Sequence, residues 1–236
     1  MRTIFKRGQS LFMGSIMHLL FPTSCLLCQS TGEGLCASCD LKILRQRERL
    51  NLCERDLWAA AHYGDELAQV ILLAKEKNNS IARNFLVNLL VETFMRATKD
   101  FTEPLTVTLI PIPSSKSANR KRGYRHSFLL AKGLAARVEN SSSHRVAVVE
   151  VLRVNRRIAD QSNLSKSERV KNLSGAYSAK TRLPPFSGTT VGSVVFLIDD
   201  LVTSGTSVRE GVRALKEAGI IPNAVLSAGV GRRVFS

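Results

Sequence analysis

Two spacings of apolar residues alternate along most of this chain. Short apolar runs predict strands at 57–63, 105–110, 146–152, 194–198 and 224–230. Apolar residues three and four positions apart predict helices at 81–95, 127–138 and 205–218, and another that Asp65 would cap. A charged helix is expected at 41–49. Because strands and helices alternate, we predict an α/β fold with a parallel sheet and flanking helices.

One predicted strand ends in two adjacent acids. Residues 194–198 are apolar without alternation, which is typical of a strand buried on both faces of a parallel sheet. Asp199 and Asp200 follow at its carboxyl end, where open α/β sheets bind ligands. The next loop is rich in hydroxyl and glycine residues, namely Thr203, Ser204, Gly205, Thr206 and Ser207. Its hydroxyl and backbone N–H groups donate to anions, Gly205 lets the backbone come close, and the helix that begins near Thr206 adds its positive end.

These residue types predict a sugar-phosphate site. Carboxylates repel a bare phosphate, so we expect Asp199 and Asp200 to hold ribose hydroxyls and a Mg²⁺ ion that bridges to the phosphate. The run resembles the signature with which type I phosphoribosyltransferases bind 5-phosphoribosyl-1-pyrophosphate (PRPP). That resemblance implies that the paired acids contact the ribose diol and that the 203–207 loop wraps the 5′-phosphate. The alternative is an ordinary strand-to-helix turn with an acidic helix start.

A second predicted strand end carries donors and cations. After the strand at 105–110, prolines fix the backbone, and Pro113 and Ser114 stand where an anion would bind. A cationic cluster follows, made of Arg120, Lys121, Arg122 and Arg125. We expect this cluster on the same face as the acids, with Arg120 binding PRPP and Arg122 stabilising pyrophosphate, which arginine binds bidentately. The candidate catalytic residues are Asp199, Asp200 and Arg122. The alternative is a solvated surface run.

Four of the five cysteines form two C-x-x-C pairs close together, at Cys25, Cys28, Cys36 and Cys39. Turn residues in the gap let both pairs fold around one tetrahedral Zn²⁺ ion, which predicts a structural zinc site. Disulfides are one alternative, but they need an oxidising compartment. A redox C-x-x-C is the other, but such motifs come singly. Cys53 is left as a spare thiol.

We expect two domains, an N-terminal helix and zinc finger at 1–54 and a ligand-binding domain at 55–236. In the first, apolar residues near 12–20 share one helical face behind a basic start. This run is too short to span a bilayer, so no transmembrane segment is expected. A docking helix is the favoured interpretation, and peripheral membrane contact is the alternative.

Charge narrows the classes of partner. The chain has 236 residues and 44% hydrophobic residues, enough for a core without disulfides. Its 34 Lys and Arg against 19 Asp and Glu give a net charge of +15, which favours polyanions such as nucleic acid or polyphosphate. Aromatic residues make up 6%, so a base-stacking platform is not visible and any DNA contact would be mostly to phosphates. The basic, polar segment 152–177 is typical of a lid.

Taken together, several motifs resemble the competence protein F (ComF) family of phosphoribosyltransferase-like proteins. They are the cysteine pairs, I-P-I-P at 110–113, R-G-Y at 122–124, A-D-Q at 159–161 and N-L-S-G-A-Y at 172–177. The chain departs from the family at Arg125 and His126, where Asn-Gln is usual. The resemblance implies a type I phosphoribosyltransferase fold behind a zinc finger, a cytoplasmic location and an association with DNA uptake in competent bacteria.

The same resemblance implies a reaction that displaces pyrophosphate from C1 of PRPP, with Mg²⁺ and Arg or Lys stabilising the leaving group. No residue identifies an acceptor base, and the oligomeric state stays open. Two hypotheses therefore stand: a transferase acting on PRPP, and a non-catalytic module for single-stranded DNA with PRPP or a nucleotide as regulatory ligand. The second would bring partners from the DNA-uptake machinery.

Overall fold

The computed structural model describes residues 24–32, 34–46, 49–155, 175–180 and 193–234. The chain divides into two compact units, Met1–Lys42 and Ile43–Ser236. This division falls earlier than the expected boundary at residue 54, because β1 (Leu50–Leu52) pairs with β2 (Arg55–His62) inside the second unit. The expected docking helix at 12–20 lies outside the described residues.

The first unit has one described helix, α2 (Ala37–Lys42). The helix expected at 41–49 is wrong for residues 43–46 and 49, which are not helical. Instead, the chain runs beside β2, where His62 N–H donates to the Leu44 carbonyl and Gln46 N–H donates to the Ala60 carbonyl. Sheet pairing with a buried strand therefore overrides the local helix propensity of this charged segment.

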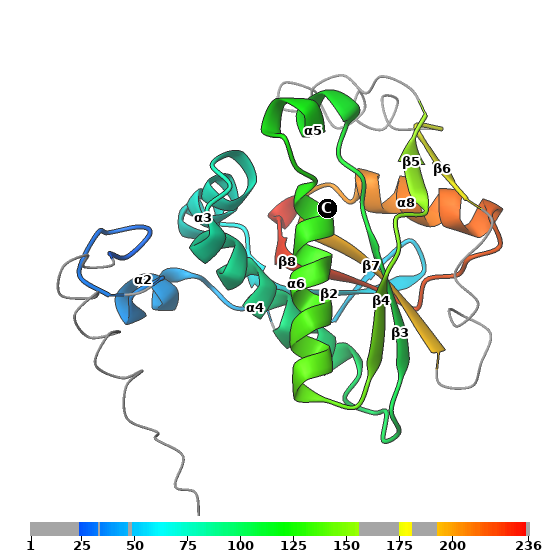
Figure 1. Ribbon diagram of the computed structural model, residues 1–236, viewed down its shortest axis with the longest axis horizontal. Helices are drawn as coiled ribbons and strands as arrows, with labels where there is room; N and C mark the ends of the chain where they lie inside the picture. The colour runs from blue at the N-terminus through cyan, green and yellow to red at the C-terminus, as the bar shows by residue number, and fades with distance from the viewer. Residues whose placement is uncertain (1–23, 33, 47–48, 156–174, 181–192, 235–236) are drawn as a thin grey trace, which may run out of the picture. The chain divides into compact units, whose positions relative to one another are not determined.

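The second unit is built around a six-stranded sheet in the order β1-β2-β8-β7-β3-β4 (Figure 1). Its remaining strands are β3 (Thr106–Pro111), β4 (Arg145–Val148), β7 (Ser193–Val202) and β8 (Ala224–Val230). All neighbours are parallel except β1 and β2. The predicted parallel sheet is confirmed. The strand expected at 146–152 is two strands: β4 ends at Val148, and β5 (Leu152–Val154) pairs with β6 (Tyr177–Ala179) in a separate ribbon.

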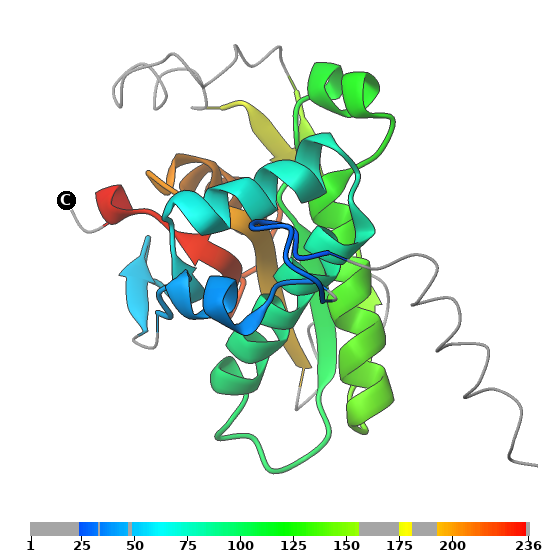
Figure 2. The ribbon, with the colours of Figure 1, turned by 90° about the vertical axis from the view of Figure 1, so that its left-hand side faces the viewer.

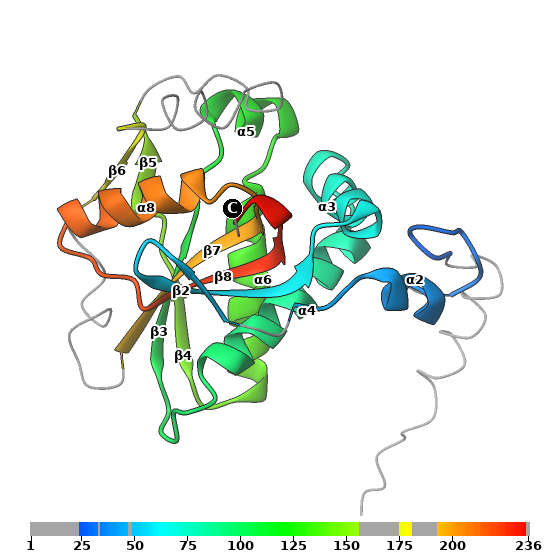
Figure 3. The same cartoon turned by 180° about the vertical axis from the view of Figure 1, so that it is seen from behind.

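Helices cover both faces of this sheet. They are α3 (Asp65–Glu76), α4 (Ser80–Ala97), α6 (His126–Ser141) and α8 (Thr206–Glu217). The short α5 (Lys116–Arg122) lies beyond the ends of the strands (Figure 1), and the 3₁₀ turn Arg232–Val234 follows β8. Helix α6 lies in front of the sheet in Figure 1 and behind it in Figure 3, and α8 does the reverse. Figure 2 shows α4 beside α6 on the same face of the sheet. Asp65 does not cap α3, because Gly64 takes the cap position and Asp65 is the first helical residue.

The core fills both sides of the central strands. Residues 194–200 of β7 are all buried, as is every residue of β8. Phe94 of α4 packs edge-to-face on Phe196 of β7, with ring centroids 5.9 Å apart. Among the described residues, no helix has the length and apolarity needed to cross a membrane.

The connections of β3 and β7 create a gap at the carboxyl edge of the sheet. The chain passes from β3 through α5 and α6 to β4, and from β7 through α8 to β8. These two neighbouring strands therefore send their connections in opposite directions. Such a switch point is where open α/β sheets bind ligands. The predicted acids and the predicted cationic cluster each follow one of these two strands.

Candidate functional site

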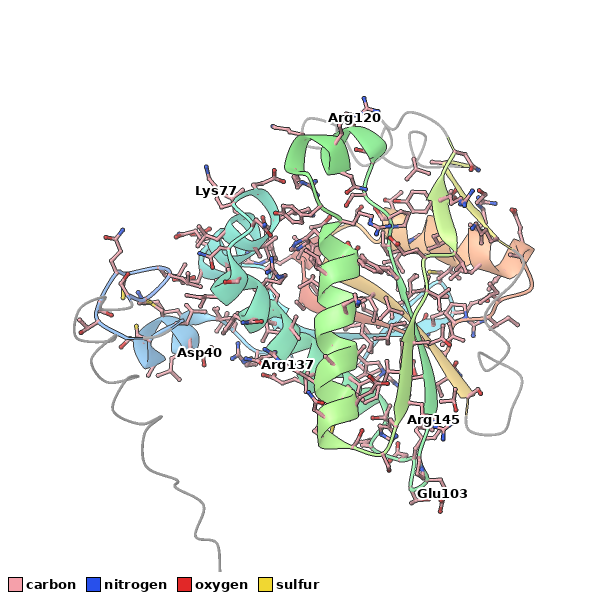
Figure 4. The ribbon with its side chains drawn as sticks, viewed as in Figure 1. Asp40, Lys77, Glu103, Arg120, Arg137 and Arg145 are labelled. Carbon is pink, nitrogen blue, oxygen red and sulfur yellow. The ribbon has the colours of Figure 1, made fainter. Side chains whose placement is uncertain are left out.

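A cavity of about 710 Å³ opens at this switch point. Its walls come from the end of α3, the β3–α5 loop, α5, Tyr177 of β6 and the β7–α8 loop. Seven of the residues proposed from the sequence line it: Pro113, Ser114, Arg122, Asp199, Asp200, Thr203 and Ser207. The other four, Arg120, Ser204, Gly205 and Thr206, do not line it. Arg120 is exposed and extends from α5 away from the sheet (Figure 4).

The two acids lie side by side within the last part of β7. Asp199 and Asp200 are 8% and 3% exposed, and both border the cavity. Lys75 Nζ lies 2.8 Å from Asp200 Oδ2, and His126 Nε2 lies 3.4 Å from the same oxygen. Asp199 instead accepts a hydrogen bond from the Asp200 backbone N–H at 3.0 Å. The two carboxylates therefore have different partners.

These partners separate the pKa values of the two acids. Burial raises the pKa of Asp199 well above its usual value, and repulsion from Asp200 adds to this rise. Burial alone would also raise the pKa of Asp200, but Lys75 and His126 outweigh it and hold that pKa below its usual range. Attraction from Asp200 raises the pKa of Lys75. Asp200 is therefore ionised in the free protein, while Asp199 takes up a proton more readily.

The hydroxyl loop after β7 is held in part by its own contacts. Ser204 Oγ lies 2.9 Å from Thr206 Oγ1, so these two hydroxyls pair with each other. Gly205 has φ of +73°, and a Cβ atom there would lie 2.8 Å from Leu52 Cδ1. Glycine at this position therefore allows a left-handed turn and close packing on Leu52 of β1. Thr203 and Ser207 are left facing the cavity.

Helix α5, which sequence reasoning missed, carries Arg122 into the site. Ser115 caps it by accepting from Ala118 N–H at 3.2 Å, and Gly123 ends it with φ of +76°. Arg122 Nε lies 3.1 Å from Glu76 Oε1, and only 9% of the Arg122 side chain is exposed. Arg122 Nη1 is buried and has no hydrogen-bond partner among the described residues. The cavity thus contains a guanidinium with an unused donor.

Lys75 is the second functional residue that sequence reasoning missed. Lys75 stands in a predicted helix whose apolar residues account for the spacing, so the lysine itself gives no sign of a binding role. The Tyr124 hydroxyl lies 3.0 Å from the Ala74 carbonyl oxygen and 2.6 Å from that of Lys75. This contact ties the end of α3 to the segment after α5. The available signal was the position of Tyr124 in R-G-Y, within the cationic cluster between Arg122 and Arg125.

Tyr177 is the third feature of the site that sequence reasoning missed. Its backbone N–H donates to Glu210 Oε1 at 3.0 Å, and its carbonyl accepts from Arg213 Nη2 at 2.8 Å. Arg213 and Glu210 of α8 also pair with each other at 2.7 Å. This network holds the Tyr177 ring at the cavity, with its hydroxyl 3.4 Å from the Pro113 carbonyl oxygen. The β3–α5 loop and α8 are therefore linked across the site.

The donor set suits a hard divalent cation bound together with an anion. Asp199 and Asp200 offer carboxylate oxygens at the cavity wall, which Mg²⁺ prefers over nitrogen or sulfur. Arg122, Lys75 and Lys121 line the same cavity and carry positive charge. The residues present therefore fit a magnesium-bound phosphate compound, with Asp199 and Asp200 toward the metal.

The four paired cysteines come together in the first unit. The sulfur atoms of Cys25, Cys28, Cys36 and Cys39 all lie within 4.8 Å of one another. Four thiolates around one Zn²⁺ at a Zn–S distance of about 2.3 Å are roughly 3.8 Å apart, so the cluster is close to a zinc site. Cys28 Sγ and Cys36 Sγ are already 3.6 Å apart.

The electrostatics of this cluster call for a cation. Burial alone would raise the pKa of the Cys25 thiol, but backbone N–H groups of Cys28 and Cys36 donate to its sulfur and lower that pKa to about 6. Burial and the neighbouring thiols raise the pKa of Cys39 to about 12. A bound Zn²⁺ would hold all four as thiolates, whereas without it the thiolates repel one another.

We expect purified protein to carry one zinc ion per chain and Cys36→Ser to lose it. Metal analysis by mass spectrometry measures the zinc, and Cys53→Ser, which alters the cysteine outside the cluster, is the matched control. The sheet unit should stay folded in both variants, because its core is separate. Fluorescence of Trp58, the only tryptophan, reports on β2 of that unit. Equal zinc content in both variants would contradict the assignment.

Comparisons with known proteins add the following. No family model and no curated protein matches this chain. Among solved structures, it is similar to adenine phosphoribosyltransferase from Saccharomyces cerevisiae, with 11% identity over 66% of this chain and 72% of that one, and a TM-score of 0.36. Orotate phosphoribosyltransferase from Aeropyrum pernix shares 12% identity over 79% and 87%, with a TM-score of 0.33. Adenine phosphoribosyltransferase from Trypanosoma brucei shares 14% over 70% of each chain, with a TM-score of 0.35.

Proposed function

We propose that this protein binds PRPP with Mg²⁺ in the switch-point cavity and acts as a phosphoribosyltransferase-like protein of the ComF type. The observation that supports it most directly is the buried Arg122 guanidinium, whose Nη1 has no partner among the described residues. It shares one cavity with the paired acids Asp199 and Asp200. Anion and cation sites together match a magnesium-bound pyrophosphate ester.

For each part of PRPP, the cavity offers residues that would bind it. The ribose hydroxyls would donate to Asp199 and Asp200. The 5′-phosphate would accept from Thr203 and Ser207 and from the first backbone N–H groups of α8, where the helix dipole favours an anion. The pyrophosphate would lie toward Arg122.

The chemistry proposed here is transfer of the phosphoribosyl group. The C1–oxygen bond to pyrophosphate breaks, the oxygen keeps the electron pair, and an acceptor atom forms the new bond to C1. Arg122 would stabilise the charge that develops on pyrophosphate, because its largely buried guanidinium is already held at the cavity and needs little reorganisation. Bound Mg²⁺ would supply further neutralisation of that charge. Asp199 and Asp200 would fix the ribose so that C1 faces the acceptor.

Isothermal titration of the whole chain with PRPP tests the proposal. We expect one saturable site per chain in the presence of Mg²⁺. Ribose 5-phosphate and pyrophosphate should each bind more weakly than PRPP, since each fills only part of the cavity. The absence of heat with Mg²⁺-PRPP, in protein whose Trp58 fluorescence shows a folded sheet unit, would overturn the proposal.

Single-stranded DNA binding remains the alternative prediction. It needs free cations on the ligand face, and two of the four expected there are paired with acids. Arg122 pairs with Glu76, and Arg125 pairs with Glu150. Arg120 and Lys121 are exposed, while the cations expected in the 156–174 part of the lid lie outside the described residues. The contacts of the described residues therefore favour PRPP.

A further inference from the structure

Lys75 reaches into the cavity from the last turn of α3. Its side chain is 32% exposed, so the ammonium borders both solvent and the buried acids. Its ion pair with Asp200, at 2.8 Å, joins residues that are 125 positions apart. The contact of Tyr124 with the Lys75 carbonyl fixes the backbone here. Lys75 can therefore change partners by rotating its flexible side chain, without moving the helix.

A magnesium-bound phosphate compound can bind in this cavity only if some of the acids and cations that line it change partners. Its lining acids are Glu76, Asp199 and Asp200, and its lining cations are Lys75, Lys121 and Arg122. Lys75 and Arg122 are already paired with acids. Arg122 Nη1 has no partner among the described residues, but Lys75 Nζ already contacts Asp200 Oδ2, one of the two carboxylate oxygens that this residue offers to a metal. Asp200 cannot bind the Lys75 ammonium and a metal ion strongly at the same time, because two positive charges this close to each other repel.

His126 is the second neighbour of Asp200 at the cavity wall. The imidazole is fully buried, and its Nε2 lies 3.4 Å from Asp200 Oδ2. Neither ring nitrogen has a hydrogen-bond partner among the described residues. His126 is the first residue of α6, so its position is set by that helix and not by Lys75.

We propose that Lys75 is an exchangeable counter-ion, which pairs with Asp200 in the free protein and with phosphate groups of the ligand once a cation occupies Asp200. The proposal deepens the proposed PRPP site and rests on it. It assigns Lys75 a role in binding that the sequence pattern did not suggest. It also implies that Asp200 weakens the binding of a phosphate compound without metal, because Asp200 competes for the Lys75 ammonium.

Titration with sodium pyrophosphate in the absence of divalent metal tests this competition. Asp200→Asn frees Lys75 and should tighten pyrophosphate binding by roughly tenfold. The double variant Lys75→Met/Asp200→Asn should lose that gain. Lys77→Met is the matched control, since Lys77 is exposed just beyond the end of α3 (Figure 4) and should leave binding unchanged. All titrations are run at a temperature where Trp58 fluorescence shows every variant folded.

The metal side of the exchange has its own measurement. Lys75→Met should tighten binding of Mn²⁺ by roughly tenfold, as counted from the electron paramagnetic resonance signal of the free ion. Lys75→Arg keeps the charge and should bind Mn²⁺ as the parent does. A gain for pyrophosphate that persists in the double variant, or equal Mn²⁺ affinity in Lys75→Met and the parent, would overturn the exchange. The proposed function fails separately, on the parent's titration with Mg²⁺-PRPP.

Discussion

Arg122→Ala is expected to weaken binding of Mg²⁺-PRPP by roughly a hundredfold, the loss typical when a buried charged contact is truncated. The Arg122 side chain is 9% exposed and lines the cavity. Its Nη1 atom has no hydrogen-bond partner among the described residues. Stability should change little, because Glu76, its partner, is 36% exposed and can be hydrated after the change. Isothermal titration measures the affinity, and thermal melting checks the fold.

Arg120→Ala is the matched control for this prediction. Arg120 and Arg122 stand on the same short helix, but Arg120 is exposed and does not line the cavity. It should keep affinity within about threefold of the parent, as expected for a charge at the rim of a site. Arg122→Lys should recover only part of the loss, because lysine lacks the planar fork that reaches both Glu76 and a phosphate. Equal losses from both alanine variants would contradict the proposed role of Arg122.

The sequence predicted the parts of the site that depend on local pattern. The strand at 224–230 has the expected bounds, whereas β7 runs to Val202 and not to 198, so the two acids lie within its last part and not after its end. The two C-x-x-C pairs do form one cluster. Each of these features is fixed by neighbours within a few positions, where periodicity and spacing carry the information.

The rest depends on contacts between distant segments. The pair of Lys75 with Asp200 and the hydrogen bond from Tyr177 N–H to Glu210 arise only when the sheet and helices assemble. Likewise, Leu52 fills the space beside Gly205, which the loop sequence alone suggested was open to a ligand. Helix α5 was overlooked because its seven residues carry no apolar periodicity. The Ser115 cap and Gly123 stop were its readable signals.

We expect the two adjacent acids to affect stability in opposite directions. At neutral pH, Asp200→Asn should lower the free energy of unfolding by about 3 kcal/mol, since it leaves Lys75, whose side chain is 32% exposed, without its carboxylate partner. Asp199→Asn should raise it, because it removes a buried carboxylate that repels Asp200. For a sheet unit of this size, the first change corresponds to a fall in melting temperature of roughly 6 to 12 °C. Melting curves followed by Trp58 fluorescence measure both.

The pH dependence separates these effects from a simple loss of packing. The folded-state pKa of Asp199 is raised, so its ionisation costs stability as pH climbs from 3.8, the usual value, toward the raised one. The advantage of Asp199→Asn should therefore grow by about 1.4 kcal/mol for each pH unit in that window. The folded-state pKa of Asp200 is lowered, so its contribution is complete above 3.8 and is lost only as pH falls below that value. The deficit of Asp200→Asn should therefore not grow between about pH 5 and about pH 8, and it should shrink where Asp199 titrates, because removing Asp200 also removes part of the rise in the pKa of Asp199. A deficit that grows with pH for Asp200→Asn, or an advantage for Asp199→Asn that does not, would show that Lys75 pairs with the other acid in solution.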